Sequence, residues 1–394
     1  MKLVFFTHPD FLEHQSMPRF ARILVRGMRD RGHDVEVWSP KAIFSRLPVP
    51  PALKKWLGYA DQFLLFPFTV RKRLRHCPAD TLFVFTDQAL GPWFPLVSGR
   101  PHVFHCHDFL AQRSALGGIP ENPTGWTGRK YQEIIRKGFC RGSYFISVSG
   151  ATQADLHQAL PVQPRISEVV YNALDPAFRP TDPAKARSIL SKHTGLDLHR
   201  GYLLHIGGNQ WNKNRAGVVE IYQAWRTLSG RRLPLILIGE QPAPELSGYL
   251  ETSSFSADIR LIGQAGDELV RMAYSGAAGL LFPSLAEGFG WPVAEAMACG
   301  CPVITTGEAP MTEVAGKAGF YIPRRPRENS RIGDWARTSA QIVEQVVSLS
   351  GPERAQVILS GLKNAERFQA GPILNRVESI YREVLAPSSR PRLH

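Results

Sequence analysis

The residues best suited to chemistry lie in one segment, positions 279–306, which reads GLLFPSLAEGFGWPVAEAMACGCPVITT. Two apolar runs with the composition of buried strands enclose a glycine-containing turn and a helix that begins near Pro292. Gly288 and Gly290 let the backbone approach a ligand closely. A helix N-terminus presents amide groups and a partial positive charge that suit phosphate. The segment therefore predicts an anion site at the start of this helix.

Two carboxylates accompany the predicted anion site. Glu287 lies in the turn before the helix and Glu295 about one turn inside it, so both can face one cavity from different heights. A carboxylate beside a phosphate is unfavourable unless it accepts hydrogen bonds from another group, and sugar hydroxyls are suitable donors. The alternative is a pair of solvated acids that favour the positive end of the helix dipole.

The rest of the chain shows which elements must position these residues. Short runs rich in Val, Ile, Leu and Phe alternate with stretches of helical period, the pattern of parallel strands joined by covering helices. A linker with three prolines, residues 172–183, separates two such series. Two doubly wound units are predicted, with ligands outside the carboxyl ends of their strands and a deep cleft where the units face one another. The expected strands are 3–7, 34–39, 81–86, 102–106, 144–148 and 168–171, then 202–206, 233–239, 259–262, 279–282, 302–305 and 319–322.

Residues 287–298, EGFGWPVAEAMA, resemble the E-x7-E signature of the retaining glycosyltransferases of family 4, which have the GT-B fold. Further similar segments follow in the family's order along nearly the whole chain: 31–35, 107–108, 148–149, 155–156, 171–175, 206–208, 213–214, 238–239, 282–284 and 313–316. The resemblance implies an α/β chain of two Rossmann-like domains facing across a cleft. Residues 1–178 would form the acceptor-binding domain, together with a C-terminal helix of about 373–394 that crosses back to it. Residues 179–372 would bind the nucleotide sugar, and no metal or other cofactor would be required.

The resemblance implies catalytic roles for three residues. Glu287 would face the donor sugar near the diphosphate, and Lys213 would stabilise the leaving nucleotide. His107 would project from the amino-terminal domain toward the transferred sugar and steady positive charge there, without acting as a general base. The alternatives are an exposed lysine at a helix start and a structural histidine, since His102 and His105 lie close to His107 in the sequence.

The resemblance also implies a set of donor-binding residues. Glu295 would bind the ribose, the backbone of Phe289 and Gly290 the diphosphate end, and the backbone around Ile262 the base. The full set is Glu295, Gly288, Phe289, Gly290, Gly208, Asn209, Arg215, Ile262, Gly263 and Ser16.

Three positions depart from the family pattern. Gly208 stands where the family often has an arginine, and Arg215, two residues past Lys213, is the candidate to compensate. The family's amino-terminal Gly-Gly turn is replaced by residues 13–17, EHQSM, in which Ser16 is the remaining candidate donor of a hydrogen bond. The linker lacks the family's glycine and is expected to be a stiffer hinge.

Composition narrows the classes of protein that fit. The chain has 394 residues, enough for two or three domains, and no apolar run approaches the roughly 18 residues of a membrane-spanning helix. Five cysteines without a C-x-x-C pair suit neither a disulfide framework nor a zinc ribbon, and the opening residues do not resemble a secretory signal. A cytoplasmic location is expected. The net charge of +13 favours phosphorylated ligands, anionic lipid or polyanions as partners.

Residues 54–75 carry six basic residues against one acid and are dense in aromatic residues. This pattern suits a helix or hairpin lying at an anionic membrane surface. It suits equally well an amphipathic element that packs on the amino-terminal sheet and leaves a basic end in solvent. No nucleic-acid-binding module surrounds the segment, so nucleic acid is not an expected partner.

These expectations combine into a single function. The chain is expected to move a hexose, with retention, from a UDP- or GDP-sugar to a glycan or lipid-linked acceptor in cell-surface polysaccharide biosynthesis, peripherally at the inner face of the cell membrane. The alternatives are a sugar-nucleotide epimerase, a glycan phosphorylase, or a non-catalytic protein of the same fold that binds nucleotide or glycan.

Overall fold

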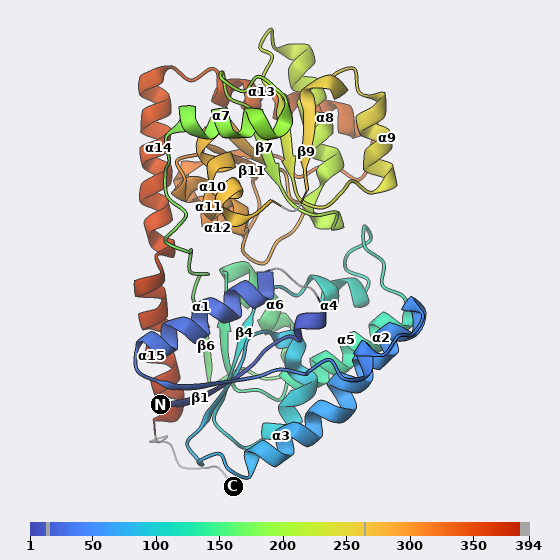
Figure 1. Cartoon of the computed structure of the whole chain (residues 1–394), viewed down its shortest axis with the longest axis vertical. Coiled ribbons are helices and arrows are strands. Elements are labelled where there is room, and N and C mark those ends of the chain that lie inside the picture. Colours follow the sequence, from blue (N-terminus) through green and yellow to red (C-terminus); the bar gives the residue numbers. More distant parts are fainter. Residues whose placement is uncertain (13–15, 264, 387–394) are drawn as a thin grey trace. The chain divides into compact units, whose positions relative to one another are not determined.

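The computed structural model describes residues 1–12, 16–263 and 265–386 of the chain. The chain divides into two compact units (Figure 1). The N-terminal unit comprises Met1–Ala173 and the chain from Ala370 onward, and the C-terminal unit comprises Leu174–Gln369. Each unit is a six-stranded parallel sheet covered by helices on both faces. The doubly wound α/β architecture predicted for both halves is confirmed.

The sheet of the N-terminal unit has the strand order β2-β1-β3-β4-β5-β6. Its strands form where apolar runs were expected, except that β6 begins two residues earlier than predicted. This strand lies at the sheet edge and is only partly buried, so its apolar pattern is weak. The bounds are β1 (Lys2–Phe6), β2 (Asp34–Trp38), β3 (Leu82–Phe85), β4 (His102–Cys106), β5 (Tyr144–Ser147) and β6 (Ile166–Val169).

Aromatic side chains build the core of this unit. The ring of Phe6 stacks on that of Phe85 with centroids 4.7 Å apart, and Phe85 stacks on Phe104 at 4.5 Å. The covering helices are α1 (Ser16–Asp30), α2 (Pro51–Ala60), α3 (Phe66–Leu74), α4 (Leu110–Ala115), α5 (Trp126–Phe139) and α6 (Gly150–Ala159). A π-helical turn over Asp61–Leu65 joins α2 to α3 without a break.

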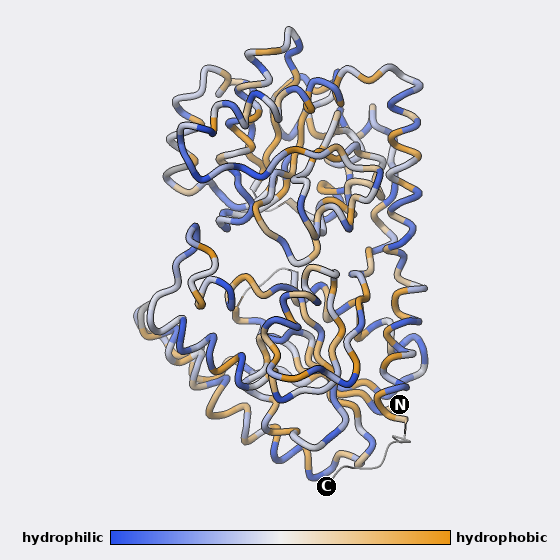
Figure 2. Tube along the Cα trace, turned by 180° about the vertical axis from the view of Figure 1, so that it is seen from behind, coloured by the Kyte–Doolittle hydropathy of each residue, from blue (hydrophilic) through white to orange (hydrophobic). Residues whose placement is uncertain are grey.

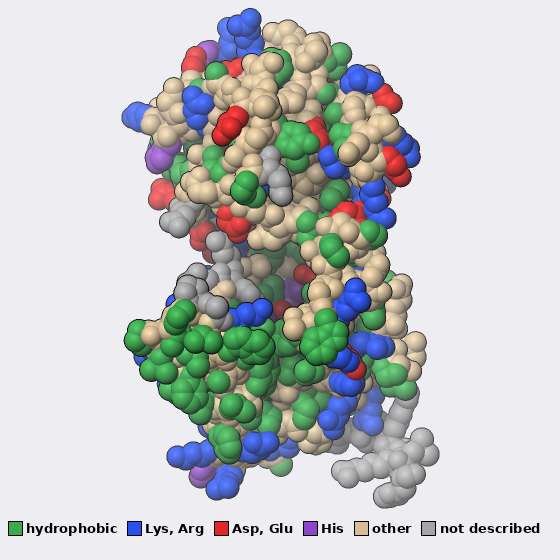
Figure 3. Space-filling view, turned by 90° about the vertical axis from the view of Figure 1, so that its right-hand side faces the viewer, with side chains coloured by type: hydrophobic (Ala, Val, Ile, Leu, Met, Phe, Trp, Pro, Cys, Tyr) green, Lys and Arg blue, Asp and Glu red, His purple; other side chains and the backbone are tan. Residues whose placement is uncertain are grey.

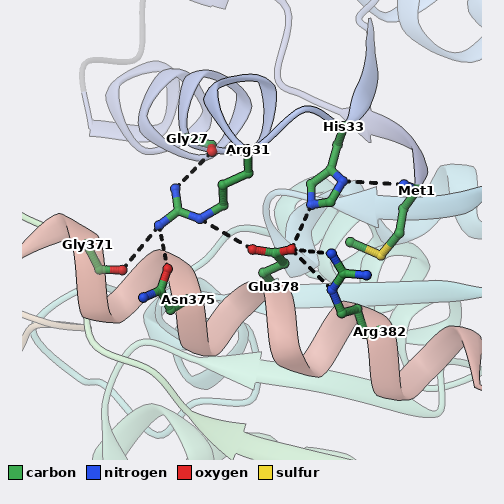
Figure 4. A network of polar contacts seen from close by, with 8 residues as sticks. All are labelled: Met1, Gly27, Arg31, His33, Gly371, Asn375, Glu378 and Arg382. Carbon is green, nitrogen blue, oxygen red and sulfur yellow. Dashed lines mark hydrogen bonds and ion pairs between the residues drawn. The ribbon is translucent and has the colours of Figure 1, made fainter.

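The C-terminal helix α15 (Ala370–Leu385) belongs to the N-terminal unit and packs on α1. Figure 4 shows Glu378 of α15 in polar contact with Arg31 and His33, which lie in the turn after α1, and with Arg382 of the same helix. Its Oε1 lies 3.1 Å from Nε2 of His33 and 2.6 Å from Nη2 of Arg382, and its Oε2 lies 3.4 Å from Nε of Arg31. The hydroxyl of Tyr381, on the same helix, contacts Nε2 of His105 at 2.7 Å inside the unit.

The sheet of the C-terminal unit has the strand order β12-β11-β10-β7-β8-β9. Its strands are β7 (Leu203–Ile206), β8 (Leu235–Ile238), β9 (Ile259–Ile262), β10 (Gly279–Phe282), β11 (Val303–Thr306) and β12 (Gly319–Ile322). The helices are α7 (Pro183–Thr194), α8 (Arg215–Leu228), α9 (Pro244–Thr252), α10 (Asp267–Gly276), α11 (Trp291–Ala298), α12 (Met311–Ala315), α13 (Asn329–Val347) and α14 (Gly351–Ala365). Hydrophobic residues concentrate on the strands inside each unit (Figure 2), as expected for sheets covered on both faces.

The chain passes between the units twice, at residues 173–174 and 369–370. Beside the first passage, the backbone amide of Leu174 donates to the carbonyl of Phe368 at 2.8 Å, and Leu174 forms a parallel bridge with Gln369. The proline-rich linker continues to Asp182, whose carboxylate caps α7 by accepting from the amide of Ala184. Within the described residues, no helix is both long and apolar enough to cross a bilayer.

Candidate active site

The strand order of the C-terminal unit identifies where a ligand is expected. Strand β7 lies between β10 and β8, so the chain winds outward in opposite directions from the boundary between β7 and β10. Open parallel sheets bind ligands at such a switch point, outside the carboxyl ends of the strands, because the loops there diverge. The loop after β7 carries Gly208 and Lys213, and the loop after β10 carries Glu287.

Lys213 and Glu287, which are 74 residues apart in the sequence, meet at this point. The Nζ atom of Lys213 lies 2.8 Å and 3.0 Å from the two carboxylate oxygens of Glu287, and the side chains are 20% and 9% exposed. The hydroxyl of Ser284 donates to Oε1 of Glu287 at 2.7 Å. The site therefore holds a fixed ammonium group beside a fixed carboxylate, both partly shielded from water.

Two asparagines brace the loops that carry this pair. The side-chain amide of Asn212 donates to the carbonyl of Ala286 at 2.8 Å, and the carbonyl oxygen of Asn212 lies 2.7 Å from the hydroxyl oxygen of Ser284. Asn214, with φ of +50°, caps α8 and donates to the carbonyl of Pro283 at 2.9 Å. No pattern in the sequence indicated a role for Asn212, Asn214 or Ser284. The position of Asn214 directly before a helix was a usable signal for a cap.

Helix α11 begins where the glycine-containing turn predicted it. Gly290 caps the helix with φ of +97°, a backbone conformation that favours glycine, and Gly288 lies earlier in the same turn. The side chain of Phe289 is buried and its ring packs on those of Trp291 and Phe368.

Glu295 lies in the second turn of α11 and is 4% exposed. The hydroxyl of Tyr274, on α10, donates to its Oε2 at 3.0 Å. Burial and the nearby Glu295 carboxylate raise the pKa of Tyr274 well above its usual value, so the hydroxyl remains a donor. Glu295 and Glu287 are thus held by different elements, one by a neighbouring helix and one by the loops at the switch point.

The remaining predicted donor-binding residues of this unit lie along the carboxyl edge of β7, β8 and β9. Arg215 is 5% exposed, and its Nη1 donates to the side chain of Asn209 at 2.7 Å and to the carbonyl of Glu240 at 2.9 Å. Burial lowers the pKa of Arg215 against the opposite effect of Glu240. Among the described residues, Nε and Nη2 of Arg215 have no hydrogen-bond partner. Two nitrogen atoms of Arg215 therefore still have hydrogens to donate, although its guanidinium group is buried.

At Gly208, an added Cβ would lie 2.6 Å from Oε1 of Gln210 and 2.8 Å from Oε1 of Glu240. Ile262 ends β9, and its carbonyl accepts from the amide of Gly239 at 3.1 Å. Gly263 follows directly.

His107 lies in the N-terminal unit, directly after β4. Its Nε2 is 2.9 Å from the carbonyl of Thr86, its amide donates to Oε1 of Gln88 at 3.0 Å, and its carbonyl accepts from Thr152. Burial lowers its pKa against the opposite effects of Asp87 and Thr86, so the imidazole is neutral near pH 7, with the Nε2 proton directed at the Thr86 carbonyl. All three neighbouring histidines are buried, but His102 and His105 lie within β4, whereas His107 follows the strand.

Two other features of this unit bear on the predicted residues. Nε2 of His8, which follows β1, lies 2.8 Å from Oδ2 of Asp87, which follows the neighbouring strand β3. No pattern in the sequence indicated this pair. Ser16 is the exposed first residue of α1. Residues 13–15 of the segment that replaces the family's Gly-Gly turn lie outside the described residues.

Two family models match the chain. The model described as Glycosyltransferase Family 4 matches residues 17–178, and the model described as Glycosyl transferases group 1 matches residues 200–337.

The O-antigen chain mannosyltransferase B of Escherichia coli is 34% identical over 193 residues, which are 48% of this chain and 48% of that protein. The alpha-maltose-1-phosphate synthase of Mycolicibacterium smegmatis is 24% identical over 74% of this chain and 75% of that protein. The matched segments thus span about half or less of the first two curated relatives, 48% and 36% of their lengths.

Solved structures share the fold over nearly the whole chain. HepE of Anabaena, in complex with UDP and glucose, has a TM-score of 0.71 at 18% identity and covers 97% of this chain and 100% of its own. WaaG, a glycosyltransferase involved in lipopolysaccharide biosynthesis, has a TM-score of 0.70 at 17% identity and covers 96% of this chain and 99% of its own. The resemblance seen in the E-x7-E segment is therefore confirmed along both units: the chain belongs to the glycosyltransferases of family 4 and has the GT-B fold.

Proposed function

We propose that this glycosyltransferase moves a hexose from a nucleotide diphosphate sugar, with retention of anomeric configuration, to a glycan or lipid-linked acceptor in cell-surface polysaccharide biosynthesis. The observation that carries the proposal is the contact between Lys213 and Glu287 at the switch point of the C-terminal sheet. An ammonium group suits a diphosphate, and a carboxylate beside it suits the hydroxyls of the attached sugar.

The donor would replace the direct contact between these two side chains. Its diphosphate would take Lys213, which then stabilises the negative charge that develops on the leaving nucleotide. Glu287, still held by Ser284, would accept hydrogen bonds from the sugar. The turn of Gly288, Phe289 and Gly290 would lie at the diphosphate end.

The nucleoside would extend over the other predicted donor-binding residues. Glu295 would accept from the ribose, and the backbone at Ile262 and Gly263 would contact the base. Arg215 would compensate for the absence of an arginine at Gly208 through the guanidinium atoms that lack a protein partner. UDP is the nucleotide in the HepE complexes, and the Escherichia coli relative is named as a mannosyltransferase, so UDP- and GDP-sugars are both candidate donors.

We also propose that no metal is required, because Lys213 supplies a fixed positive charge where the diphosphate would bind. Transfer is then expected to continue at full rate in excess EDTA. Loss of transfer in EDTA and recovery with a divalent cation would contradict this part of the proposal.

The N-terminal unit would receive the acceptor, and His107 would contribute there as a neutral imidazole facing the transferred sugar. An acceptor linked to lipid lies at the inner face of the cell membrane. We therefore propose that the enzyme works in the cytoplasm and associates peripherally with that membrane through residues 54–75.

Isothermal titration with UDP and GDP tests the donor site. One nucleotide is expected to bind at micromolar to millimolar concentration. Lys213→Ala is expected to weaken that binding, whereas Lys192→Ala, an exposed lysine on α7, leaves it unchanged. Absence of binding by either nucleotide at millimolar concentration would remove the basis of the proposal.

Turnover tests the reaction itself. Membrane extracts with a panel of UDP- and GDP-sugars are expected to yield a product that keeps the donor's anomeric configuration. Glu287→Ala is expected to lower kcat by about 10²-fold, the scale of losing one group that stabilises a transition state. Exposed Glu251→Ala is the matched control. Conversion of the nucleotide sugar to its epimer without acceptor would instead indicate an epimerase.

A further inference from the structure

The segment over residues 51–74 is one continuous helical rod with apolar residues on its outer side as well as on the side that faces the unit. Helix α2, the π-helical turn and α3 follow one another without an intervening loop. Leu53, Trp56, Leu64 and Phe68 are 53%, 62%, 61% and 70% exposed. Their spacings of three, eight and four residues are close to multiples of the helical period, so they form one stripe along the rod, called here the apolar ridge.

The rod is anchored to the unit by its opposite side. Phe66 and Val70 are buried in the core with Phe6 and Trp93. The backbone carbonyl of Gln62 accepts from the indole nitrogen of Trp93 at 3.1 Å. The apolar ridge is therefore not a core face that happens to be uncovered, since the rod has a separate core face.

The single acid of the segment, Asp61, is turned inward. Its carboxylate accepts from the hydroxyl of Ser45 at 2.7 Å and from the amides of Ile43, Phe44 and Ser45. Burial raises the pKa of Asp61, but these hydrogen bonds outweigh that effect and leave the pKa lowered. The carboxylate therefore remains ionised. It is hydrogen-bonded to the loop of residues 43–45 on the inner side of the rod, so it places no negative charge beside the apolar ridge.

All six basic side chains of the segment are exposed: Lys54, Lys55, Arg71, Lys72, Arg73 and Arg75. They lie at the two ends of the apolar ridge, and the guanidinium of Arg71 is 6.0 Å from the ring centroid of Phe68. Figure 3 shows the resulting surface in the lower half of the view, where hydrophobic side chains gather above a group of Lys and Arg.

We propose that the apolar ridge of residues 51–74 lies flat on an anionic bilayer, with Leu53, Trp56, Leu64 and Phe68 inserted below the headgroups and the basic ends on lipid phosphates. A second copy of this chain would place the same cations against one another, and a neutral apolar partner would leave them unused. An anionic lipid surface satisfies both the apolar stripe and the charge. The apolar ridge and its basic ends would be the surface that contacts the membrane in the proposed peripheral association, on which this inference rests.

Vesicle binding of the full chain tests this contact surface without any turnover. Binding to phosphatidylglycerol–phosphatidylcholine vesicles is expected, with little binding to pure phosphatidylcholine and weaker binding at high salt. The variant Trp56→Ser/Leu64→Ser/Phe68→Ser is expected to reduce the partition coefficient at least about tenfold, because three apolar side chains no longer insert.

Matched variants distinguish vesicle binding through the apolar ridge from nonspecific binding by other exposed apolar side chains. Leu228→Ser/Leu359→Ser replaces side chains of the C-terminal unit that are 56% and 60% exposed and is expected to bind vesicles as the parent does. Lys54→Gln/Lys55→Gln/Lys72→Gln keeps the apolar ridge, removes three of the six cations and is expected to weaken the preference for anionic lipid.

Three outcomes would overturn the inference. They are absence of binding to anionic vesicles, equal loss in the control variant, and conversion of a dimer to a monomer by the ridge variant, which would show that a second copy covers the ridge. Because no nucleotide is present, failure here leaves the donor-site titration unaffected, and failure of that titration leaves the vesicle result standing.

Discussion

Ser284 is the residue on which the geometry of the Lys213–Glu287 pair depends. It is fully buried, and its hydroxyl donates to Glu287 and contacts the carbonyl of Asn212, so it links the loops after β7 and β10. Lys213 supplies the charge of the pair, whereas Ser284 fixes the orientation of the carboxylate. Because Ser284 would act on the donor only through Glu287, its loss is expected to affect turnover more than donor binding.

Ser284→Ala is expected to lower the free energy of unfolding by about 1–3 kcal/mol, because a buried carboxylate loses a donor. It is also expected to lower kcat severalfold with a smaller change in KM. Urea unfolding and steady-state kinetics measure the two effects. Ser254→Ala, at an exposed position of the same unit, should change neither. Wild-type values for Ser284→Ala would show that Lys213 alone orients Glu287.

At the scale of elements, the start of α11 depends on one glycine conformation. Gly290→Ala forces a side chain into φ of +97° and is expected to destabilise the C-terminal unit by about 1–2 kcal/mol. Nucleotide affinity should fall as well, because the turn that leads into the helix shifts. Gly351→Ala is a suitable control, since an added Cβ there meets nothing within 4 Å and φ is ordinary. Differential scanning calorimetry distinguishes the two substitutions.

The attachment of α15 to the N-terminal unit depends on Glu378. Its neighbours Arg382 and His33 lower its pKa, with the hydrogen bond from Arg382 as the largest effect. Glu378→Gln is expected to cost about 1–3 kcal/mol of unfolding free energy in that unit, because His33 and Arg31 lose a charged acceptor. Glu383→Gln, exposed on the same helix, is expected to be neutral. Equal stability of both variants in urea would mean that apolar packing alone holds the helix.

The elements were more accessible from the sequence than the contacts among them. Buried strands appear in the sequence as short apolar runs, so the bounds of β10 and β11 were predicted to within one residue. The edge strand β6 was predicted two residues too late, because only half of its residues from Ile166 to Val169 are apolar. For residues 54–75, composition left open a helix or hairpin, and the structure shows a helix. Its aromatic content alone could not reveal that Asp61 faces inward and Trp56 outward.

The site shows the same limit. The E-x7-E segment indicated Glu287 and Glu295 as candidates because local spacing carries that information. The partners of these carboxylates, Ser284 excepted, come from other elements: Lys213 follows β7, and Tyr274 lies on α10. Only the strand order brings them together, and strand order is set by tertiary packing rather than by local pattern.

At the scale of the whole molecule, each unit has a buried histidine in a central strand, His105 in β4 and His205 in β7. Burial lowers the pKa of both to about 3, from an ordinary value near 6.5. Between these values the unfolded chain binds a proton at each position and the folded chain does not. The free energy of unfolding is therefore expected to fall as the pH drops below 6.5, by about 1.4 kcal/mol per pH unit for each histidine.

Urea unfolding at pH values from 7 to 4.5 measures this slope. His205→Asn is expected to make the slope shallower, and His193→Asn, exposed on α7, is expected to leave it unchanged. An identical slope in His205→Asn and the parent would assign the acid sensitivity to other groups.

The double passage of the chain at residues 173–174 and 369–370 has a consequence for protease digestion. A single nick in the proline-rich linker would leave the two fragments associated, because α15 stays covalently joined to the C-terminal unit through the second passage and packs on α1 of the N-terminal unit. Limited proteolysis should then give two bands under denaturing electrophoresis while gel filtration still shows one particle of unchanged size.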